Sequence, residues 1–166
     1  MAQIYKGRPP RLKQVFQSDG WPLYFVTFNA LGRQPILACD VVHDAWVAYT
    51  EKGVGFGVGV GRYVVMPDHI HAFVRIGPEM RLKRWSAGVK RALGIALKSA
   101  GVRPYCCAES GLKSYWQPVF FDRLLRHDDS YAQKWGYVHE NPVRAGLVDC
   151  SDDWLYQGEI VLIDRA

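Results

Sequence analysis

The chain has 166 residues, of which 49% are apolar and 22% charged, and its formal net charge at pH 7 is +5. These values are typical of one globular domain with a sizeable core. No run approaches the ~18 to 20 apolar residues of a membrane span, so no membrane partner is expected. The positive charge favours polyanions, of which nucleic acid is the commonest in a cytoplasm.

The first 20 residues are polar and basic, contain two consecutive prolines, and are interpreted as an N-terminal arm. No apolar block follows its cations directly, so the arm does not resemble a secretory signal. The cations of this arm are Lys6, Arg8, Arg11 and Lys13. Residues 21–150 are expected to form a single domain, and residues 151–166 a C-terminal extension.

The first elements of the domain are a strand and a helix. Aromatic and β-branched residues predict a strand over residues 21–29. Asp40 is a suitable N-cap for a helix over residues 41–51 that ends at Gly53. Glycines alternate with apolar residues between positions 55 and 61, and this pattern predicts a loop or an irregular strand.

A hairpin and a long helix follow. Strands are predicted over residues 62–66 and 69–76, and a tight turn over residues 67–68 joins them. The next apolar periodicity predicts a helix over residues 81–100, which Gly101 closes.

The last predicted elements are a short strand and a second amphipathic helix. Residues 119–122 are apolar and aromatic, which predicts a fourth strand. Asp128 or Asp129 is the expected cap of a helix that reaches about Asn141. Pro142 should end this helix, because a residue before proline is pushed away from helical geometry.

This order of elements predicts an α+β fold. Strand, helix, strand, strand, helix, strand is the βαββαβ order of ferredoxin-like domains, which have an antiparallel sheet with helices on one face. The final helix, which carries two tyrosines, would be an addition to that fold. Many functions occur on such folds, so function has to be argued from particular residues.

Two histidines at strand spacing are the first candidate site. His69 and His71 flank Ile70, and alternate side chains of a strand point to the same face. The pair could therefore hold one metal ion. The alternative is a pair of hydrogen-bonded structural histidines.

The long helix has an apolar stripe and a basic face. At about 100° per residue, its tryptophan, valine and leucines fall on one side. The opposite side carries Lys83, Arg84, Lys90, Arg91 and Lys98. This face lacks interleaved acids, which fits a phosphate-binding surface, and a solvated helix surface is the alternative.

The final helix separates its two tyrosines. Tyr131 shares the core stripe with Trp135 and Val138, whereas Tyr137 falls on the polar side. Asn141 lies one turn after Tyr137 on the same face. An ordinary amphipathic surface tyrosine is the alternative interpretation of Tyr137.

The four cysteines are interpreted as reduced thiols of a cytoplasmic protein. They are Cys39, Cys106, Cys107 and Cys150, and none forms a CxxC motif. Four cysteines in a chain of this size do not build a disulfide scaffold. A structural zinc site that combines the histidines with Cys106 or Cys107 stays open as an alternative.

Three segments together resemble one family. VVMPDHIHAFV (residues 64–74), WQPVFFDRLLRHDDSY (residues 116–131) and YVHENPVRAGLV (residues 137–148) are similar to segments of the single-tyrosine HUH transposases, and most resemble the REP-associated tyrosine transposases. A His-hydrophobic-His triplet alone is a weak signal. The triplet strand combined with YxxxNPVRAGLV is a specific one, and the likeness spans residues 21–148.

The resemblance implies roles for particular residues. His69 and His71 would hold a divalent metal, Mg²⁺ or Mn²⁺, with Asn141 as third ligand. Glu140 is the adjacent rival for that position, although it faces farther from the histidines if Tyr137 faces them. Tyr137 would be the nucleophile that becomes a 5′-phosphotyrosine.

The implied activity is cleavage and rejoining of single-stranded DNA at hairpin or palindromic repeat ends. The basic arm and the basic helix face would contact DNA phosphates, with a disordered tail as the alternative for the arm. A nucleic-acid-binding regulator without catalysis and a rolling-circle-type replication initiator are alternatives. Monomer and homodimer are both open.

Overall fold

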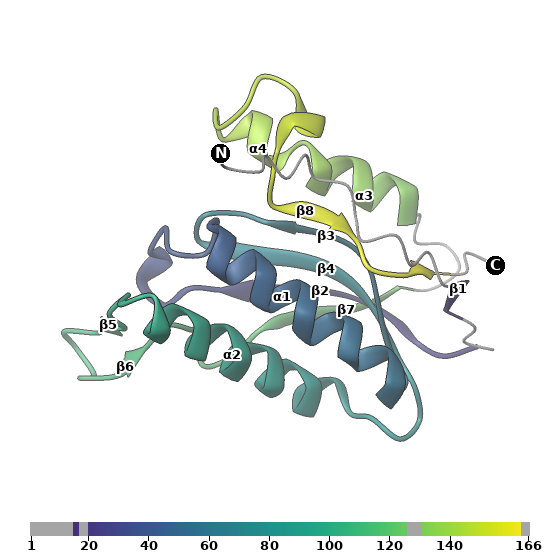
Figure 1. Cartoon of the computed structure of the whole chain (residues 1–166), viewed down its shortest axis with the longest axis horizontal. Coiled ribbons are helices and arrows are strands. Elements are labelled where there is room, and N and C mark those ends of the chain that lie inside the picture. The colour runs from purple at the N-terminus through teal and green to yellow at the C-terminus, as the bar shows by residue number, and fades with distance from the viewer. Residues whose placement is uncertain (1–14, 17–19, 126–130, 164–166) are drawn as a thin grey trace.

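The computed structural model describes residues 15–16, 20–125 and 131–163 (Figure 1). The arm cations and the two candidate caps of the final helix lie outside the described residues. None of the described helices combines the length and hydropathy needed to cross a bilayer.

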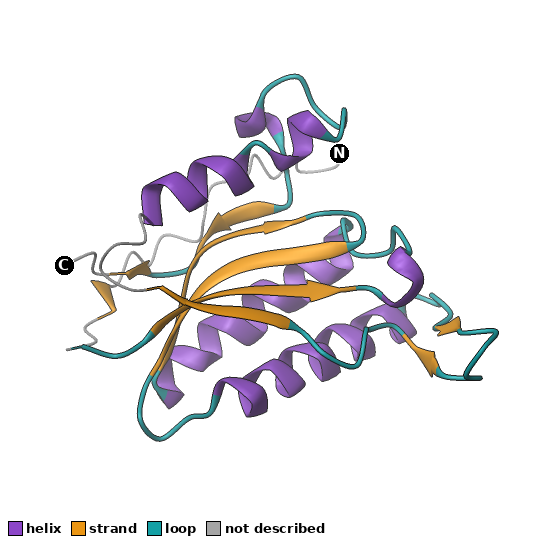
Figure 2. Ribbon diagram, turned by 180° about the vertical axis from the view of Figure 1, so that it is seen from behind, coloured by secondary structure: helices purple, strands orange, loops and turns teal. Residues whose placement is uncertain are grey.

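A five-stranded antiparallel sheet forms the centre of the molecule, in the order β7-β2-β4-β3-β8 (Figure 2). This sheet and its helices confirm the α+β prediction. Its strands are β2 (Leu23–Asn29), β3 (Val58–Val65), β4 (His69–Ile76), β7 (Phe121–Leu125) and β8 (Gln157–Glu159). No strand was predicted at β8, which lies within the C-terminal segment that was expected to form an extension.

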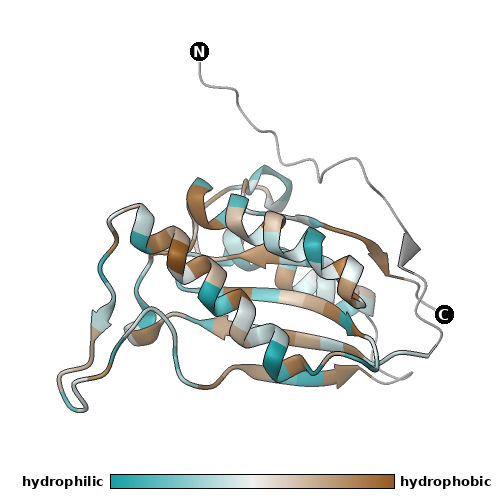
Figure 3. Cartoon of the chain, turned by 60° about the horizontal axis from the view of Figure 1, so that its bottom comes forward, coloured by the Kyte–Doolittle hydropathy of each residue, from teal (hydrophilic) through white to brown (hydrophobic). Residues whose placement is uncertain are grey.

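Two long helices, α1 (Asp40–Gly53) and α2 (Leu82–Ser99), cover one face of the sheet (Figure 1). The side chain of Ile70 is fully buried in the core that also contains Trp46 and Trp85. On α2 the predicted apolar stripe is buried, while hydrophilic residues recur along the outer helix surface (Figure 3). Gly101 follows this helix with a φ of 78°, a left-handed conformation that glycine adopts readily.

The opposite face carries α3 (Tyr131–His139) and α4 (Asn141–Arg144). Val138 packs with Val64 and Met66 in a second small core. The ring of Tyr131 lies 4.2 Å from that of Phe73, between centroids. Both Tyr131 and Val138 are buried, as the apolar stripe predicted.

Short elements complete the chain. A two-stranded parallel pair joins β1 (Val15–Phe16) to β9 (Leu162–Ile163), and β5 (Tyr105–Cys106) pairs with β6 (Lys113–Ser114) in a hairpin beside α2. Single 3₁₀ turns occupy η1 (Leu31–Arg33), η2 (Val54–Phe56) and η3 (Ser151–Asp153). The register between β3 and β4 shifts after Val60, so the glycine-rich segment includes an irregular strand.

Two predicted boundaries in the second half of the chain are wrong. The fourth strand begins two residues later than expected, at Phe121. The final helix ends at His139, and Pro142 belongs to the first turn of α4 instead of ending a helix. Proline is tolerated in a first turn because the amide hydrogen that it lacks would have no intrahelical acceptor there.

The predicted cap of the first helix is also wrong. Cys39 occupies the N-cap position of α1, without a side-chain hydrogen bond, and Asp40 lies within the first turn. The carboxylate of Asp40 accepts a hydrogen bond from the Tyr156 hydroxyl at 3.2 Å. Its charge is still favourable there, because it lies near the positive end of the helix dipole.

Candidate active site

The two histidines of β4 lie on the sheet face away from α1 and α2. Both side chains are partly buried, whereas Ile70 between them is fully buried in the opposite direction. The ring centroids of His69 and His71 are 4.7 Å apart, and the ring planes form an angle of 76°. The strand alternation therefore predicted their common face correctly.

Each imidazole is held through its Nδ1 atom. His69 Nδ1 lies 2.6 Å from Asp68 Oδ1, and His71 Nδ1 lies 2.8 Å from Thr27 Oγ1. Among the described residues, the Nε2 atoms of both rings have no hydrogen-bond partner. Hydrogen bonds of this kind orient metal-binding histidines and fix which ring nitrogen remains free.

Burial also keeps one ring neutral. Desolvation, together with the positive charges of His69 and Arg33, lowers the pKa of His71 to about 3, although Asp68 opposes the shift. The ring is therefore neutral near pH 7, which is the form that binds a metal.

Arg33 closes one end of the site. Its Nε lies 2.8 Å from Asp68 Oδ2, and its Nη1 donates to Asn29 Oδ1 at 2.6 Å. The backbone of Arg33 has a φ of 54°, the one positive φ among described residues other than glycine. A strained backbone at an exposed cation is a feature of functional sites.

Sequence reasoning missed all four of these supporting residues: Thr27, Asn29, Arg33 and Asp68. Asp68 adjoins the histidine pair in sequence, so it could have been identified there. Thr27 could not, because only the pairing of β2 with β4 places it opposite His71.

The orientation of α3 is set by contacts on one of its flanks. The Arg62 guanidinium lies 5.3 Å from the Trp135 ring centroid, and Arg62 also pairs with Glu159 of β8 at 3.6 Å. His139 Nε2 lies 3.3 Å from Asp152 Oδ1, in the turn that leads to β8. This flank therefore faces the β8 edge of the sheet.

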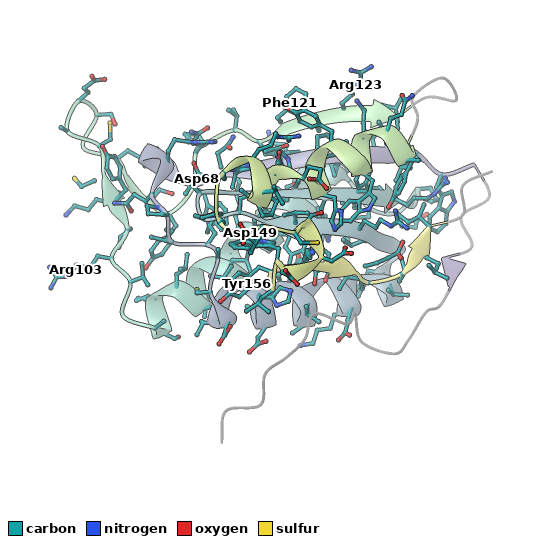
Figure 4. All side chains as sticks on the ribbon, turned by 90° about the horizontal axis from the view of Figure 1, so that it is seen from above. Asp68, Arg103, Phe121, Arg123, Asp149 and Tyr156 are labelled. Atoms are coloured by element: carbon teal, nitrogen blue, oxygen red, sulfur yellow. The ribbon has the colours of Figure 1, made fainter. Side chains whose placement is uncertain are left out.

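The other flank carries Tyr137. At about 100° per residue, Tyr137 lies on the side of α3 away from Trp135 and His139, and Asn141 begins α4 just beyond α3. Figure 4 shows α3 lying over the sheet, with Phe121 and Arg123 of β7 on one side and Asp149 and Tyr156 on the other. The Tyr137 side chain is 68% exposed, and its ring contacts Arg144 instead of a histidine.

Arg144 links Tyr137 to Asn141. Its guanidinium lies 3.9 Å from the Tyr137 ring centroid and donates hydrogen bonds to the Tyr137 carbonyl oxygen and to Asn141 Oδ1. By contrast, Glu140 Oε1 accepts a hydrogen bond from Ser151 Oγ at 2.7 Å, on the β8 side. The structure thus directs the two candidate third ligands to different sides of the helix.

The predicted basic face of α2 is remote from the histidines, because α2 covers the opposite face of the sheet. The basic residues of this face also differ in their exposure to solvent. Lys90 is half-buried, donates to the Gln117 carbonyl oxygen at 2.7 Å, and has a pKa lowered by desolvation. Lys83, Arg84, Arg91 and Lys98 are exposed.

The structure does not support a zinc site of histidine and cysteine. Cys106 and Cys107 lie at the β5–β6 hairpin, and all four cysteines are free thiols. Within residues 20–125 and 131–163, no three histidine, cysteine or acidic side chains are grouped to hold a metal. A metal at the histidine pair would need another kind of third ligand, such as an amide oxygen.

Comparison with known proteins gives consistent relatives. No protein-family model matches the chain. A Haemophilus influenzae protein assigned to the REP-associated tyrosine transposases is 26% identical over 140 residues, which are 81% of this chain and 77% of the relative. The Escherichia coli REP-associated tyrosine transposase is 28% identical over 97 residues, which are 57% of this chain and 50% of that protein.

Solved structures agree with the sequence relatives. A REP-associated tyrosine transposase bound to a REP hairpin superposes with a TM-score of 0.61 at 23% identity, covering 82% of this chain and 75% of the other. A Deinococcus radiodurans protein assigned as a transposase superposes with a TM-score of 0.50 at 16% identity, covering 75% and 95%. These two likenesses concern the fold. In sequence this chain is similar to REP-associated tyrosine transposases, and its fold is similar to that of a solved one.

Proposed function

We propose that this protein is a metal-dependent transposase or endonuclease that cleaves and rejoins single-stranded DNA through a 5′-phosphotyrosine. The observation that carries the proposal is the pair of free Nε2 atoms on β4, on the same sheet face as α3, whose exposed Tyr137 is linked by Arg144 to Asn141 of α4. The relative bound to a REP hairpin supports hairpin or palindromic repeat ends as the substrate. A cytoplasmic location belongs to the same proposal.

His69, His71 and Asn141 would hold Mg²⁺ or Mn²⁺. Two neutral imidazoles and an amide oxygen suit such ions and leave positions open for phosphate and water. The amide oxygen of Asn141 has two lone pairs, so it can bind an ion while it accepts from Arg144. When bound, the ion neutralises phosphate charge and orients the phosphate for in-line attack.

Tyr137 would supply the nucleophile. Its hydroxyl oxygen forms a bond to phosphorus, the bond from phosphorus to the 3′-oxygen breaks, and the phenolic proton ends on the released 3′-hydroxyl. One phosphodiester replaces another, so a free 3′-hydroxyl can reverse the step without ATP. Arg144 lies against the ring, where its charge would favour the negative charge that develops on the phenol oxygen.

The strand order supports a ferredoxin-like assignment. In β7-β2-β4-β3 the first and third strands in sequence are adjacent and the second lies outside them, which is the split βαβ arrangement. On this assignment β8 and the α3–α4 segment are additions to the fold. One addition carries the proposed nucleophile to the histidine face.

Arg33 is a further candidate for phosphate contact, because it is an exposed cation paired with Asp68 beside the histidines. The basic residues of α2 would contact DNA only if the strand passes around an edge of the sheet. The proposal that they bind phosphates therefore requires a bent or flexible substrate.

The main alternatives are a catalytically silent nucleic-acid-binding regulator and a rolling-circle-type initiator. Initiators with paired tyrosines need a second nucleophile near the first. Tyr131 does not suit that role, because it is buried and its hydroxyl accepts a hydrogen bond from the Arg62 backbone amide at 3.2 Å.

A covalent adduct on a denaturing gel tests the proposal. We expect hairpin oligonucleotides with single-stranded flanks, incubated with Mn²⁺, to form an adduct that is lost with Tyr137→Phe and with His69→Ala. Tyr131→Phe is the matched control and should retain it. An adduct that survives Tyr137→Phe would exclude this nucleophile, and hairpin binding without any adduct across a varied substrate set would favour the regulator.

A further inference from the structure

A pocket lies on the helix-covered face of the sheet, between α2 and β7. Its volume is about 560 Å³, and residues of α2, β2, β7 and the segment 118–120 line it. β7 is an end strand of the five-stranded sheet, so the pocket opens at the edge of the molecule. Pockets of about 300 to 1,000 Å³ are typical of small-molecule sites.

A buried hydroxyl in the pocket wall has no partner. The side chain of Ser86 is 1% exposed, and its Oγ atom forms no hydrogen bond in the structure. Buried polar groups without a partner are uncommon, because each costs free energy. Because the oxygen atom itself is sealed from solvent, a ligand would reach it only after a small movement of the pocket wall.

Two lysines and one carboxylate give the pocket its charge pattern. Lys83 and Lys90 lie one above the other on α2 and both line the pocket, as does Asp122 of β7. The Lys90 ammonium uses one donor for the Gln117 carbonyl oxygen, and two remain. The two ammonium groups suit a phosphate, whereas Asp122 suits an amino group.

Aromatic side chains supply flat apolar surface. Tyr24 and Phe120 line the pocket, and the Lys90 ammonium lies 5.9 Å from the Phe120 ring centroid. Stacking on aromatic rings combined with cationic contacts to the backbone is the usual mode of binding unpaired bases.

The pocket lies at β2 and β7, and the histidines lie on the neighbouring strand β4, on the opposite face of the sheet. On β7, Asp122 lines the pocket, while its neighbours Phe121 and Arg123 pair with Thr27 and Phe25 of the histidine face. The distance from β4 to β7 across the sheet is two strand spacings, about 10 Å. Phe121 and Arg123 are exposed, so a DNA strand has a path around this edge.

We infer that this pocket binds one unpaired nucleobase of the DNA strand, with the flanking phosphate held by Lys83 and Lys90. The inference rests on the proposed function for the identity of the polymer. A base with an amino or ring N–H group would donate to Asp122. The pocket would thereby select a base that lies a few nucleotides from the cleaved phosphate.

Binding of short unstructured oligonucleotides tests this inference. The probes are fluorescein-labelled 12-mers of thymidine, cytidine and adenosine, and an abasic 12-mer with the same phosphates. We expect the protein to bind at least one base-bearing 12-mer about 10-fold more tightly than the abasic one. Ala87→Trp, which fills the pocket from an exposed position of α2, should remove most of that difference.

Matched controls separate the pocket from the rest of the surface. Ala48→Trp adds the same ring at an exposed position of α1, and Lys52→Gln removes a lysine outside the pocket; both should behave as wild type. Lys83→Gln should weaken binding of every 12-mer. A folded Ala87→Trp protein, verified by its thermal unfolding, that keeps the wild-type preference for bases would overturn the inference.

Two further arms complete the test. Deoxynucleoside monophosphates should compete only at concentrations far above those of the 12-mers, and competition at equal concentration would assign the pocket to free nucleotides instead. Because equilibrium binding needs no cleavage, loss of the covalent adduct would refute the proposed function alone. An adduct formed equally well by Ala87→Trp at wild-type DNA affinity would refute the pocket alone.

Discussion

The guanidinium of Arg144 lies 3.9 Å from the centroid of the Tyr137 ring and also donates to the carbonyl oxygen of Tyr137. A third contact reaches Asn141 Oδ1. One cation from α4 therefore holds both the proposed nucleophile and the proposed third metal ligand. This makes Arg144 a positioning residue of the site.

Replacement of Arg144 should separate catalysis from binding. We expect Arg144→Met to slow adduct formation on the order of 10- to 100-fold, because misplacement of reacting groups costs about that much. Hairpin affinity should change by no more than about twofold, and Arg144→Lys should restore part of the rate by returning a charge. Arg103→Met, at an exposed position near the β5–β6 hairpin, is the control. Equal rates for wild type and Arg144→Met would remove Arg144 from the site.

Thr27 should control metal affinity without binding the metal. Thr27→Val keeps the shape of the side chain but removes the hydroxyl that holds His71 Nδ1 at 2.8 Å. Loss of such a contact typically weakens metal binding 10- to 100-fold, which calorimetric titration with Mn²⁺ would measure. Thr50→Val, whose hydroxyl bonds only to carbonyl oxygens within α1, should leave Mn²⁺ affinity unchanged. Unaltered affinity in Thr27→Val would show that this bond does not orient a ligand.

The two tyrosines of α3 should respond oppositely to the same substitution. Tyr131→Phe should keep the adduct but lower the free energy of unfolding by about 1 kcal/mol, because it removes the acceptor of the Arg62 amide. Tyr137→Phe should abolish the adduct and leave stability nearly unchanged, since the side chain is exposed. Urea unfolding and denaturing gels measure the two effects. A folded Tyr131→Phe protein without activity would contradict the assigned roles.

Stability should fall in acid because of two partly buried histidines. Desolvation lowers the pKa of His71 to about 3 and also lowers that of His43, from an ordinary value of 6.5. Below pH 6.5 the unfolded chain therefore binds more protons than the folded one, so stability decreases as pH falls from 6.5 toward 3. For His71 the slope should approach about 1.4 kcal/mol per pH unit between these limits.

Urea unfolding with a chelator present, at intervals from pH 7 to pH 4.5, measures this slope. His71→Asn should make it shallower because one of the two groups is gone. A slope in His71→Asn equal to that of wild type would show that His71 does not remain neutral in the folded protein.

Periodicity in the sequence was sufficient for the main elements. Alternation across β4 predicted that His69 and His71 share a face, and the apolar stripe of α2 is the buried one. These inferences hold because the geometry of a single strand or helix fixes which side chains point together. The predicted end of the final helix was wrong because a proline can either end a helix or occupy the first turn of the next one. The side chains of Glu140 and Asn141 do not indicate which of the two occurs.

The composition of the candidate site was only partly accessible from the sequence. His69, His71, Tyr137 and Asn141 were visible in two motifs, and the outward position of Tyr137 followed from helical periodicity. The sequence could not show that Thr27 supports His71, since these residues are 44 positions apart and meet only through strand pairing.

Tertiary structure alone decided how the parts face one another. The contacts of Arg62 with Trp135 and of His139 with Asp152 turn one flank of α3 toward β8, and this leaves Tyr137 exposed on the flank away from β8. The same packing places the basic residues of α2 on the other face of the sheet. The physical reason is that local periodicity fixes the side of an element on which a residue lies, whereas contacts between elements distant in sequence fix where that side points.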